Sequence, residues 1–533
     1  MAHSMNRRSF LLGSAGLTAA ASMTSLAPYP WARAAAAPAT KLIVGHRTLE
    51  VKGRAAEVFG IVQPNGVSGL TLEPGDRFLV DLLNDAGEET IIHWHGQKPP
   101  FLQDGFPDTH MPLVNEGARQ PYDYAATPGT HWMHSHHGLQ AQRQMNAPLI
   151  VRSAEDVKAD RQEITIFLDD FSFSAPEELL AGLTGDPNAG HHGGHGMGVG
   201  DPPPDEIPAA GMGMSASPGM AMAPGMNMNA GMDTSAGMGG MNMGSGGTNA
   251  GSGMAGMDMG GSAPDLNDVK FDAFLANDRT LDDPEVVRVE RGGRVLLRIV
   301  NAAASTQFWI DLGTVRGTLV AVDGVPVEPI ADQRFPIAIA QRLDLVVDVP
   351  AGGAFPVFAQ VEGLTTRTGI ILAAPDAAVA KVADAAAAAA PAVDLSLEMK
   401  LRAVAPLAAR PADITIPMAL TGSMTSYLWS INDQVWPNVT PPVIREGQRV
   451  VLDLRNVTGM AHPMHLHGHT FQVIGLNGQD VAGAVRDTVL VPPRTTVRVA
   501  FDADNPGRWA FHCHNLYHQA TGMMTVIAYD GFA

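Results

Sequence analysis

Residues 75–84 read Gly-Asp-Arg-Phe-Leu-Val-Asp-Leu-Leu-Asn, and the pattern returns twice further along the chain. Residues 292–301 read Gly-Gly-Arg-Val-Leu-Leu-Arg-Ile-Val-Asn, and residues 447–456 read Gly-Gln-Arg-Val-Val-Leu-Asp-Leu-Arg-Asn. Each copy opens on a turn glycine, places apolar residues at alternate positions and ends on asparagine, which is typical of a half-buried β-strand. The sequence therefore predicts three related β domains.

The repeats are unequally spaced, by 217 and then by 155 residues, and one low-complexity segment explains the difference. Residues 190–263 carry 14 of the 27 methionines among Gly, Ser, Ala, Asn and Pro. Without these 74 residues the first spacing becomes 143, close to the second. We therefore expect a disordered, methionine-rich insertion at about 190–263.

Few segments show helical periodicity, and short alternating segments between Gly and Pro turns favour β-sandwiches. The expected fold is all-β, with domain 1 at 41–153, domain 2 with the insertion at 154–374, a linker at 375–410 and domain 3 at 411–533.

The first 40 residues are predicted to form an export signal rather than a folded domain. Arg7 and Arg8 precede an apolar run, and the Ala-rich residues 34–37 suit a signal peptidase, so the segment resembles a twin-arginine export signal. An uncleaved membrane anchor is the alternative. Since no other stretch is long and apolar enough to span a bilayer, we expect a periplasmic protein without stable membrane insertion.

Composition argues against a nucleic-acid-binding protein and against a disulfide-stabilised protein. Lys and Arg number 35 against 54 Asp and Glu, a net charge of −19, which disfavours binding to nucleic-acid phosphates. A single cysteine, Cys513, excludes an intrachain disulfide framework and leaves this residue as a thiolate, ligand or nucleophile.

Histidines of domains 1 and 3 also stand at equivalent positions relative to the repeat. Nine and eleven residues after Asn84 stand His93 and His95, and the same offsets from Asn456 give His465 and His467, whereas domain 2 has no histidine at these offsets. A second pair of His-x-His motifs follows near the end of domains 1 and 3, at 134–136 and 512–514. Residues i and i+2 of a strand point the same way, so each motif presents two imidazoles to one side.

The last motif adds softer ligands. Cys513 lies between His512 and His514, with His518 and Met523 following, and His462 precedes the third motif. A thiolate, two imidazoles and a thioether form the ligand set of a blue-copper site.

These four ordered motifs resemble the copper-binding signatures of three-domain multicopper oxidases, from about residue 41 to residue 533 apart from the insertion. The resemblance implies three cupredoxin-like Greek-key β-sandwich domains and four copper ions, one type 1, one type 2 and two type 3. It implies type 1 ligands His462, Cys513, His518 and Met523. It implies type 2 ligands His93 and His465, and type 3 ligands His95, His134, His136, His467, His512 and His514. The implied reaction couples four one-electron oxidations of substrate to the reduction of dioxygen to water.

Two further positions bear on proton delivery. Asp104, nine residues after His95, matches a family carboxylate near the cluster and is predicted to be catalytic; the alternative is a turn aspartate before Gly105. Gln519 stands where some bacterial members have a glutamate after the type 1 histidine, which puts a relay there in doubt.

The insertion indicates the reducing substrate. Thioethers suit Cu(I), so the expected activity is a cuprous oxidase in copper tolerance, with dioxygen and Cu(I) as partners of a monomer. A laccase-like oxidase of phenols and aromatic amines and a periplasmic copper-sequestering protein are the alternatives. Similar tracts mark bacterial copper-tolerance multicopper oxidases. Cuprous oxidases often carry an acid just before the third motif, but Thr458 supplies none.

Overall fold

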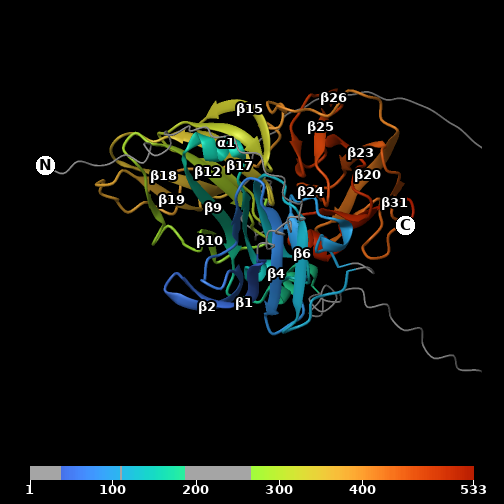
Figure 1. Cartoon of the computed structure of the whole chain (residues 1–533), viewed down its shortest axis with the longest axis horizontal. Helices are drawn as coiled ribbons and strands as arrows, with labels where there is room; N and C mark the ends of the chain where they lie inside the picture. The colour runs from blue at the N-terminus through green and yellow to red at the C-terminus, as the bar shows by residue number, and fades with distance from the viewer. Residues whose placement is uncertain (1–37, 108–110, 186–265, 533) are drawn as a thin grey trace, which may run out of the picture. The chain divides into compact units, whose positions relative to one another are not determined.

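The structure is a computed structural model, and it describes residues 38–107, 111–185 and 266–532. The predicted export signal at 1–40 lies almost wholly outside these residues, and the predicted insertion at 190–263 lies entirely outside them. The described chain folds into three successive pairs of β-sheets, coloured blue to cyan, green to yellow and orange to red in Figure 1. The predicted all-β class is confirmed.

The first pair of sheets is built around one hydrophobic core that includes Phe78, Trp94 and Tyr124. One sheet runs in the order β2 (Arg54–Val62), β1 (Thr40–Val51), β4 (Arg77–Asp85) and β6 (Arg119–Ala125). The other runs β3 (Leu70–Leu72), β8 (Asn146–Val151), β7 (Gly129–Ser135) and β5 (Ile92–His95).

The second pair encloses a core of mainly Val, Ile and Leu side chains. One sheet runs β10 (Ala273–Ala276), β9 (Gln162–Phe171), β12 (Arg294–Asn301), β17 (Arg342–Asp348), β14 (Gly317–Val322) and β15 (Val325–Asp332). The other runs β11 (Val286–Arg288), β19 (Arg367–Ala373), β18 (Ala354–Val361), β13 (Phe308–Asp311) and β16 (Arg334–Ile337).

The third pair contains the core in which Cys513 and Met523 are buried. One sheet runs β21 (Leu428–Ile431), β20 (Ile414–Ser423), β23 (Arg449–Asn456), β29 (Thr496–Asp502), β25 (Phe471–Leu476) and β26 (Gln479–Asp480), and β27 (Val485–Arg486) also pairs with β25. The other runs β22 (Val443–Ile444), β31 (Met524–Tyr529), β30 (Arg508–Cys513), β24 (His462–Leu466) and β28 (Thr488–Val491).

The repeated stretches are β4, β12 and β23, and each has the same neighbours. Each pairs in parallel with the first strand of its unit and antiparallel with a later strand. The closing asparagines also share a role, because the amides of Asn84, Asn301 and Asn456 each bond backbone carbonyls of the loop that follows. The repeat therefore specifies both a strand and the turn that leaves it.

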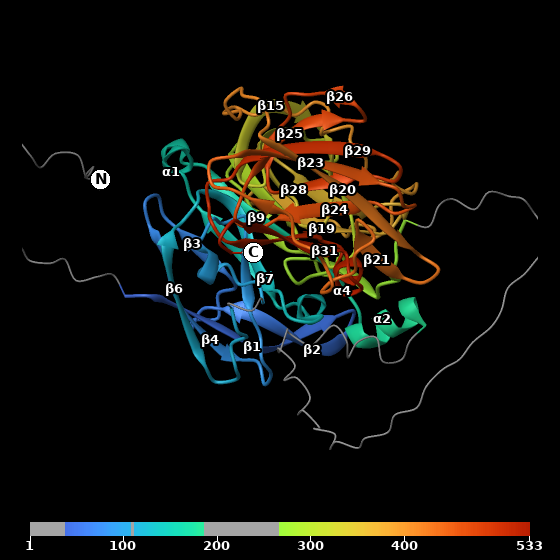
Figure 2. The ribbon, with the colours of Figure 1, turned by 90° about the vertical axis from the view of Figure 1, so that its right-hand side faces the viewer.

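Helices are short and lie at connections. In the part of the chain that the structure describes, the α-helices are α1 (Ala154–Ala159), α2 (Pro176–Thr184) and α4 (Leu516–Ala520), and the 3-10 turns are η1 (Phe101–Gln103) and η2 (Gln140–Arg143). Figure 2 shows α2 and α4 below the red and orange strands. Among the described residues no helix is long and apolar enough to cross a membrane.

Candidate copper centres

The four His-x-His motifs lie in two pairs of adjacent strands, with His136, His467 and His514 one residue past the ends of β7, β24 and β30. In the first unit β5 pairs with β7, and His93 stands opposite His134. In the third unit β24 pairs with β30, and His465 stands opposite His512. Alternate residues of a strand share a face, so each strand pair turns its imidazoles to one side, and the two sets meet in a single buried cluster.

The imidazole nitrogens that face each other form two close groups. The Nε2 atoms of His93 and His465 lie 3.4 Å apart. In the second group, His512 Nε2 lies 3.0 Å from His467 Nε2 and 3.3 Å from His136 Nε2. Each group draws histidines from both the first and the third unit, so the cluster exists only where these units meet.

A third set of nitrogens is buried and has no hydrogen-bond partner among the described residues: His95 Nδ1, His134 Nε2 and His514 Nε2. The rings of His95 and His134 each lie 5.0 Å, centroid to centroid, from the ring of His514. Buried polar atoms are rarely left without partners, and those that are call for an explanation such as a missing ion. These atoms are therefore suited to hold a metal ion.

The opposite nitrogen of most rings contacts an oxygen, which fixes the ring. His134 Nδ1 lies 3.0 Å from the backbone oxygen of Ser135, and His512 Nδ1 lies 3.0 Å from that of Cys513. His95 is turned the other way, because its Nε2 lies 3.1 Å from a carboxylate oxygen of Asp487. Oxygen contacts of this kind determine which nitrogen of a metal-binding histidine is left for the ion.

The cluster favours neutral imidazoles. Burial lowers the pKa of six histidines well below 6.5, and the neighbouring imidazoles lower it further: His95, His134, His136, His467, His512 and His514. Neutral imidazole is the form that binds metals. The site therefore presents its nitrogens ready to coordinate.

A second centre forms around the single cysteine. Cys513 Sγ lies 3.7 Å from His462 Nδ1 and 3.6 Å from His518 Nδ1, and the two nitrogens are 3.1 Å apart. All three side chains are fully buried, and burial raises the pKa of the thiol. Met523 is also buried, and its backbone oxygen accepts a hydrogen bond from the Cys513 amide.

Asp104 joins the first and third units beside the histidine cluster. Its Oδ2 lies 2.7 Å from His467 Nδ1 and its backbone oxygen 3.0 Å from His93 Nδ1, whereas Oδ1 has no hydrogen-bond partner among the described residues. Gly105 follows at φ +83°, where a Cβ would lie 1.8 Å from the backbone oxygen of Ile92. This close approach explains the glycine.

Sequence reasoning missed two acidic residues at the centres. Asp268 Oδ2 lies 2.9 Å from His518 Nε2 and accepts hydrogen bonds from Tyr427 and Asn515. Burial alone would raise the pKa of Asp268, but these contacts outweigh it and lower the pKa. The other is Asp487, which contacts His95. Neither residue belongs to a local motif, so no signal in the sequence pointed to them.

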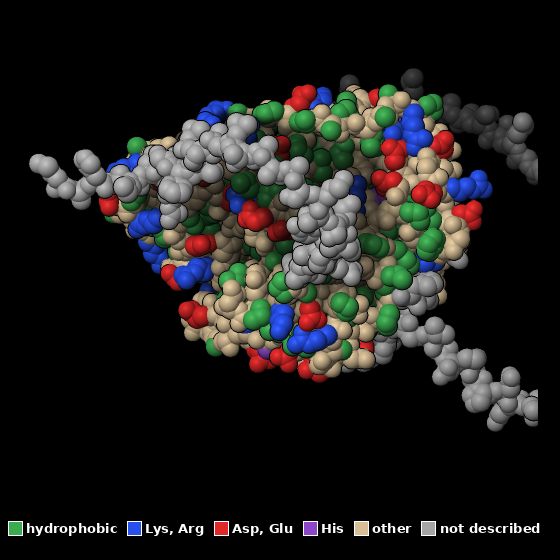
Figure 3. Space-filling model, in the orientation of Figure 1, with side chains coloured by type: hydrophobic (Ala, Val, Ile, Leu, Met, Phe, Trp, Pro, Cys, Tyr) green, Lys and Arg blue, Asp and Glu red, His purple; other side chains and the backbone are tan. Residues whose placement is uncertain are grey.

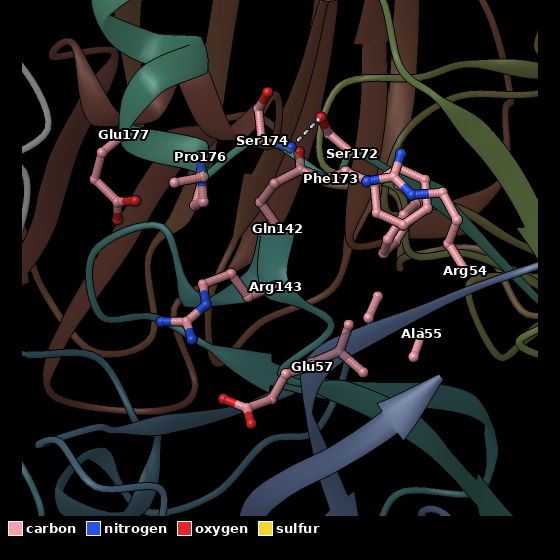
Figure 4. Close-up of a pocket in the computed structure, with 14 residues that line it drawn as sticks. Arg54, Ala55, Glu57, Gln142, Arg143, Ser172, Phe173, Ser174, Pro176 and Glu177 are labelled. Carbon is pink, nitrogen blue, oxygen red and sulfur yellow. Dashed lines mark hydrogen bonds between the residues drawn. The ribbon is translucent and has the colours of Figure 1, made fainter. Parts of the chain in front are cut away.

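Two cavities differ in their relation to the centres. One of about 20 Å³, enough for about one water molecule, reaches His134, His136 and His514 and is lined also by Gln519. A larger one of about 460 Å³ lies between β2, η2 and the loop before α2, away from the predicted ligands. In Figure 4 Arg54 stacks on Phe173 at one end of this larger cavity.

Sequence profiles described as multicopper oxidase match residues 45–156, 248–379 and 409–531. The chain is 30% identical over 473 residues to "Multicopper oxidase MmcO" of Mycobacterium tuberculosis, covering 85% of this chain and 80% of the relative. The chain belongs to the multicopper oxidase family. The predicted resemblance is thereby confirmed, and domains of this family imply copper binding.

This multicopper oxidase is similar to other known proteins along most of its length. It is 24% identical to a "Copper resistance protein A homolog" of Pseudomonas syringae pv. tomato, over 90% of each chain. A solved multicopper oxidase structure from Pseudomonas thermotolerans matches the fold with a TM-score of 0.61, at 21% identity, over 92% of this chain and 98% of that one.

Proposed function

We propose that this multicopper oxidase oxidises Cu(I) to Cu(II) in copper tolerance and passes the electrons to dioxygen. The observation that supports Cu(I) as the substrate is the position of Asp268. This residue follows the methionine-rich segment in the sequence, and its carboxylate lies 2.9 Å from His518 Nε2. The balanced reaction consumes four Cu(I), one dioxygen and four protons, and it yields four Cu(II) and two waters.

The resident copper ions would be held as the family resemblance implies. His462, Cys513, His518 and Met523 would hold the type 1 ion, and His93 with His465 would hold the type 2 ion. The six type 3 ligands would divide, by the distances between them, into one set of His136, His467 and His512 and another of His95, His134 and His514. The donor set fits copper, since thiolate, thioether and imidazole are its preferred ligands, and the unpartnered buried nitrogens support this assignment. When bound, the ions supply one-electron transfer and dioxygen reduction.

The chain itself provides the connection between the centres. Cys513 is bonded through the backbone to His512 and His514, which gives electrons a short covalent route from the thiolate to the histidine cluster. Asp104 contributes a carboxylate whose Oδ1 has no hydrogen-bond partner among the described residues and lies 3.5 Å from His93 Nδ1, and we infer that it passes protons for dioxygen reduction. The small cavity at His134 and His136 admits a molecule of the size of water or dioxygen.

The Cu(I) substrate would be captured by thioethers of residues 190–263 and then meet Asp268. Tyr427 and Asn515 fix Oδ2 of this carboxylate, whereas Oδ1 has no hydrogen-bond partner among the described residues. The side chain is buried, and we propose that Oδ1 binds Cu(I) handed over by these thioethers, so that the carboxylate would link the substrate to His518. This arrangement supplies the acid that the sequence around Thr458 lacks.

Asp268→Asn tests the substrate. We expect Cu(I) oxidation to fall at least about tenfold, with much less effect on a non-phenolic aromatic donor that needs no carboxylate, because the amide cannot bind Cu(I) as an anion. Deletion of residues 190–263 should likewise lower Cu(I) oxidation much more than oxidation of the aromatic donor. Asp272→Asn is the matched control, since Asp272 lies on the same segment but bonds Ser172 and Phe173 instead. Equal losses on both donors would contradict Cu(I) as the preferred substrate and favour a laccase.

Cys513→Ser separates oxidation from sequestration. The change removes the type 1 thiolate and leaves the methionine-rich segment intact. We expect copper-stressed cells that carry this variant to lose protection, measured as growth against added copper. Full protection would favour the copper-sequestering alternative. In this proposal the enzyme works in the periplasm after twin-arginine export.

A further inference from the structure

Arg342 of the middle unit lies at the histidine cluster, although this unit supplies none of the proposed ligands. The guanidinium of this fully buried residue grips Asp487 with two parallel hydrogen bonds, of 2.7 Å to Oδ1 and 2.5 Å to Oδ2. Its Nε donates to the backbone oxygen of Thr130, 3.1 Å away in β7. One side chain thus connects all three units.

Asp487 in turn contacts two imidazoles from different units. Its Oδ1 lies 3.1 Å from His95 Nε2, and its backbone oxygen lies 2.9 Å from His465 Nδ1. Thr488 adds a hydroxyl that donates to Asp487 Oδ1 and lies 3.2 Å from each of these histidine nitrogens. Because these contacts occupy one nitrogen of each ring, they turn His95 Nδ1 and His465 Nε2 toward the proposed copper positions.

Gly96 leaves the space that this contact needs. It has φ +85°, and a Cβ there would lie 2.4 Å from His131 Nδ1, 2.6 Å from Arg342 NH2 and 3.0 Å from Asp487 Oδ2. The glycine of the His-Trp-His-Gly motif is therefore explained by His131 of its own unit together with Arg342 and Asp487 of the other two.

Arg342 is itself held firmly. Its backbone amide donates to Asp323 Oδ1 at 2.9 Å, and Asp323 Oδ2 accepts from Arg486 Nε at 2.9 Å. Arg486 also pairs with Glu398 of the segment before the third unit. Asp323 Oδ1 also lies 3.7 Å from the Arg342 guanidinium, so this network of buried, paired charges helps to hold the guanidinium in place.

We propose that Arg342 is a positioning residue for the copper cluster, which sets the rings of His95 and His465 through Asp487. The middle unit thus acts as a clamp on ligands that the outer units supply. The inference rests on the proposed ligand assignment but not on Cu(I) as substrate.

Arg342→Met tests the clamp, and Arg342→Lys is the milder variant, since lysine keeps the charge but cannot grip both carboxylate oxygens. We expect the copper-loaded Arg342→Met protein to keep its type 1 absorption band. Its type 2 EPR spectrum should change, and a chelator should remove cluster copper about 10–100-fold faster. Arg342→Lys should change the same two readouts less.

Arg298→Met is the matched control. Arg298 is an equally buried arginine of the same unit, bonded to Thr130 Oγ1 and to Asp344, but it contacts no proposed ligand. We expect this variant to lower the melting temperature without altering the type 2 spectrum or copper release. An unchanged spectrum and release rate in both Arg342 variants would overturn the clamp, as would an equal change in Arg298→Met. A wild-type protein that binds no cluster copper would instead overturn the ligand assignment.

Discussion

At the scale of single residues, the two oxygens of Asp104 have different surroundings. Oδ2 holds the His467 ring, whereas Oδ1 has no hydrogen-bond partner among the described residues. Asp104→Asn can keep an oxygen on His467 but cannot carry a proton. We expect copper content to be retained and the turnover number with dioxygen to fall by about 100-fold, the scale of a lost general acid. Copper analysis and oxygen-uptake kinetics would check this, and undiminished turnover would show that protons arrive by another route.

The sequence predicted the candidate ligands but not the acidic residues that contact them. Histidine spacing brought together the residues predicted as ligands, because each motif lies in a strand or at the end of one and its register follows from the repeat. The acids that orient them come from remote positions: Asp487 is 392 residues from His95, and Asp268 follows low-complexity sequence. One sequence without periodicity at these positions carries no signal for such contacts. The copper roles of the histidines and the role of Asp104 stay predictions.

At the scale of elements, the repeat predicted three strands, and the structure adds the reason for their closing asparagines. Asn301 is fully buried at the end of β12, donates to the backbone oxygens of Thr306 and Ile337 and accepts from the Ala303 amide. Asn301→Ala leaves buried backbone groups unpaired, so it should destabilise the protein by about 2–3 kcal/mol. Copper content should not change, because this loop holds no proposed ligand. Denaturant unfolding with copper analysis would check this, and unaltered stability would show that water replaces the amide.

At the scale of the whole molecule, buried acids between units make stability depend on pH. Asp169 of β9 bonds Asn146 of β8, and burial raises its pKa to about 8. The folded protein therefore binds a proton that the unfolded chain releases near pH 4. The contribution of Asp169 to the free energy of unfolding is complete below pH 4. It is lost as the pH rises toward 8, by at most about 1.4 kcal/mol per pH unit. Asp169→Asn should flatten the pH dependence and leave the variant more stable than wild type at pH 8. Unfolding midpoints from pH 5 to 8 would check this, and parallel curves would contradict it.

One face of the molecule shows how the surface charges are distributed. On the face in Figure 3, Lys and Arg side chains are interspersed with Asp and Glu. The net charge of −19 therefore does not appear on this face as a single acidic field.

The distance along the chain between His93 and His465, 372 residues, has a consequence for how copper enters. Contacts this remote form late in folding, because the intervening loop must be closed first. We therefore expect the nitrogens to converge after the sheets that carry them have formed. Because each proposed ion of the cluster takes ligands from both the first and the third unit, an unfolded chain offers none of these complete ligand sets. We therefore expect the protein to take up cluster copper only after its first and third units have packed together.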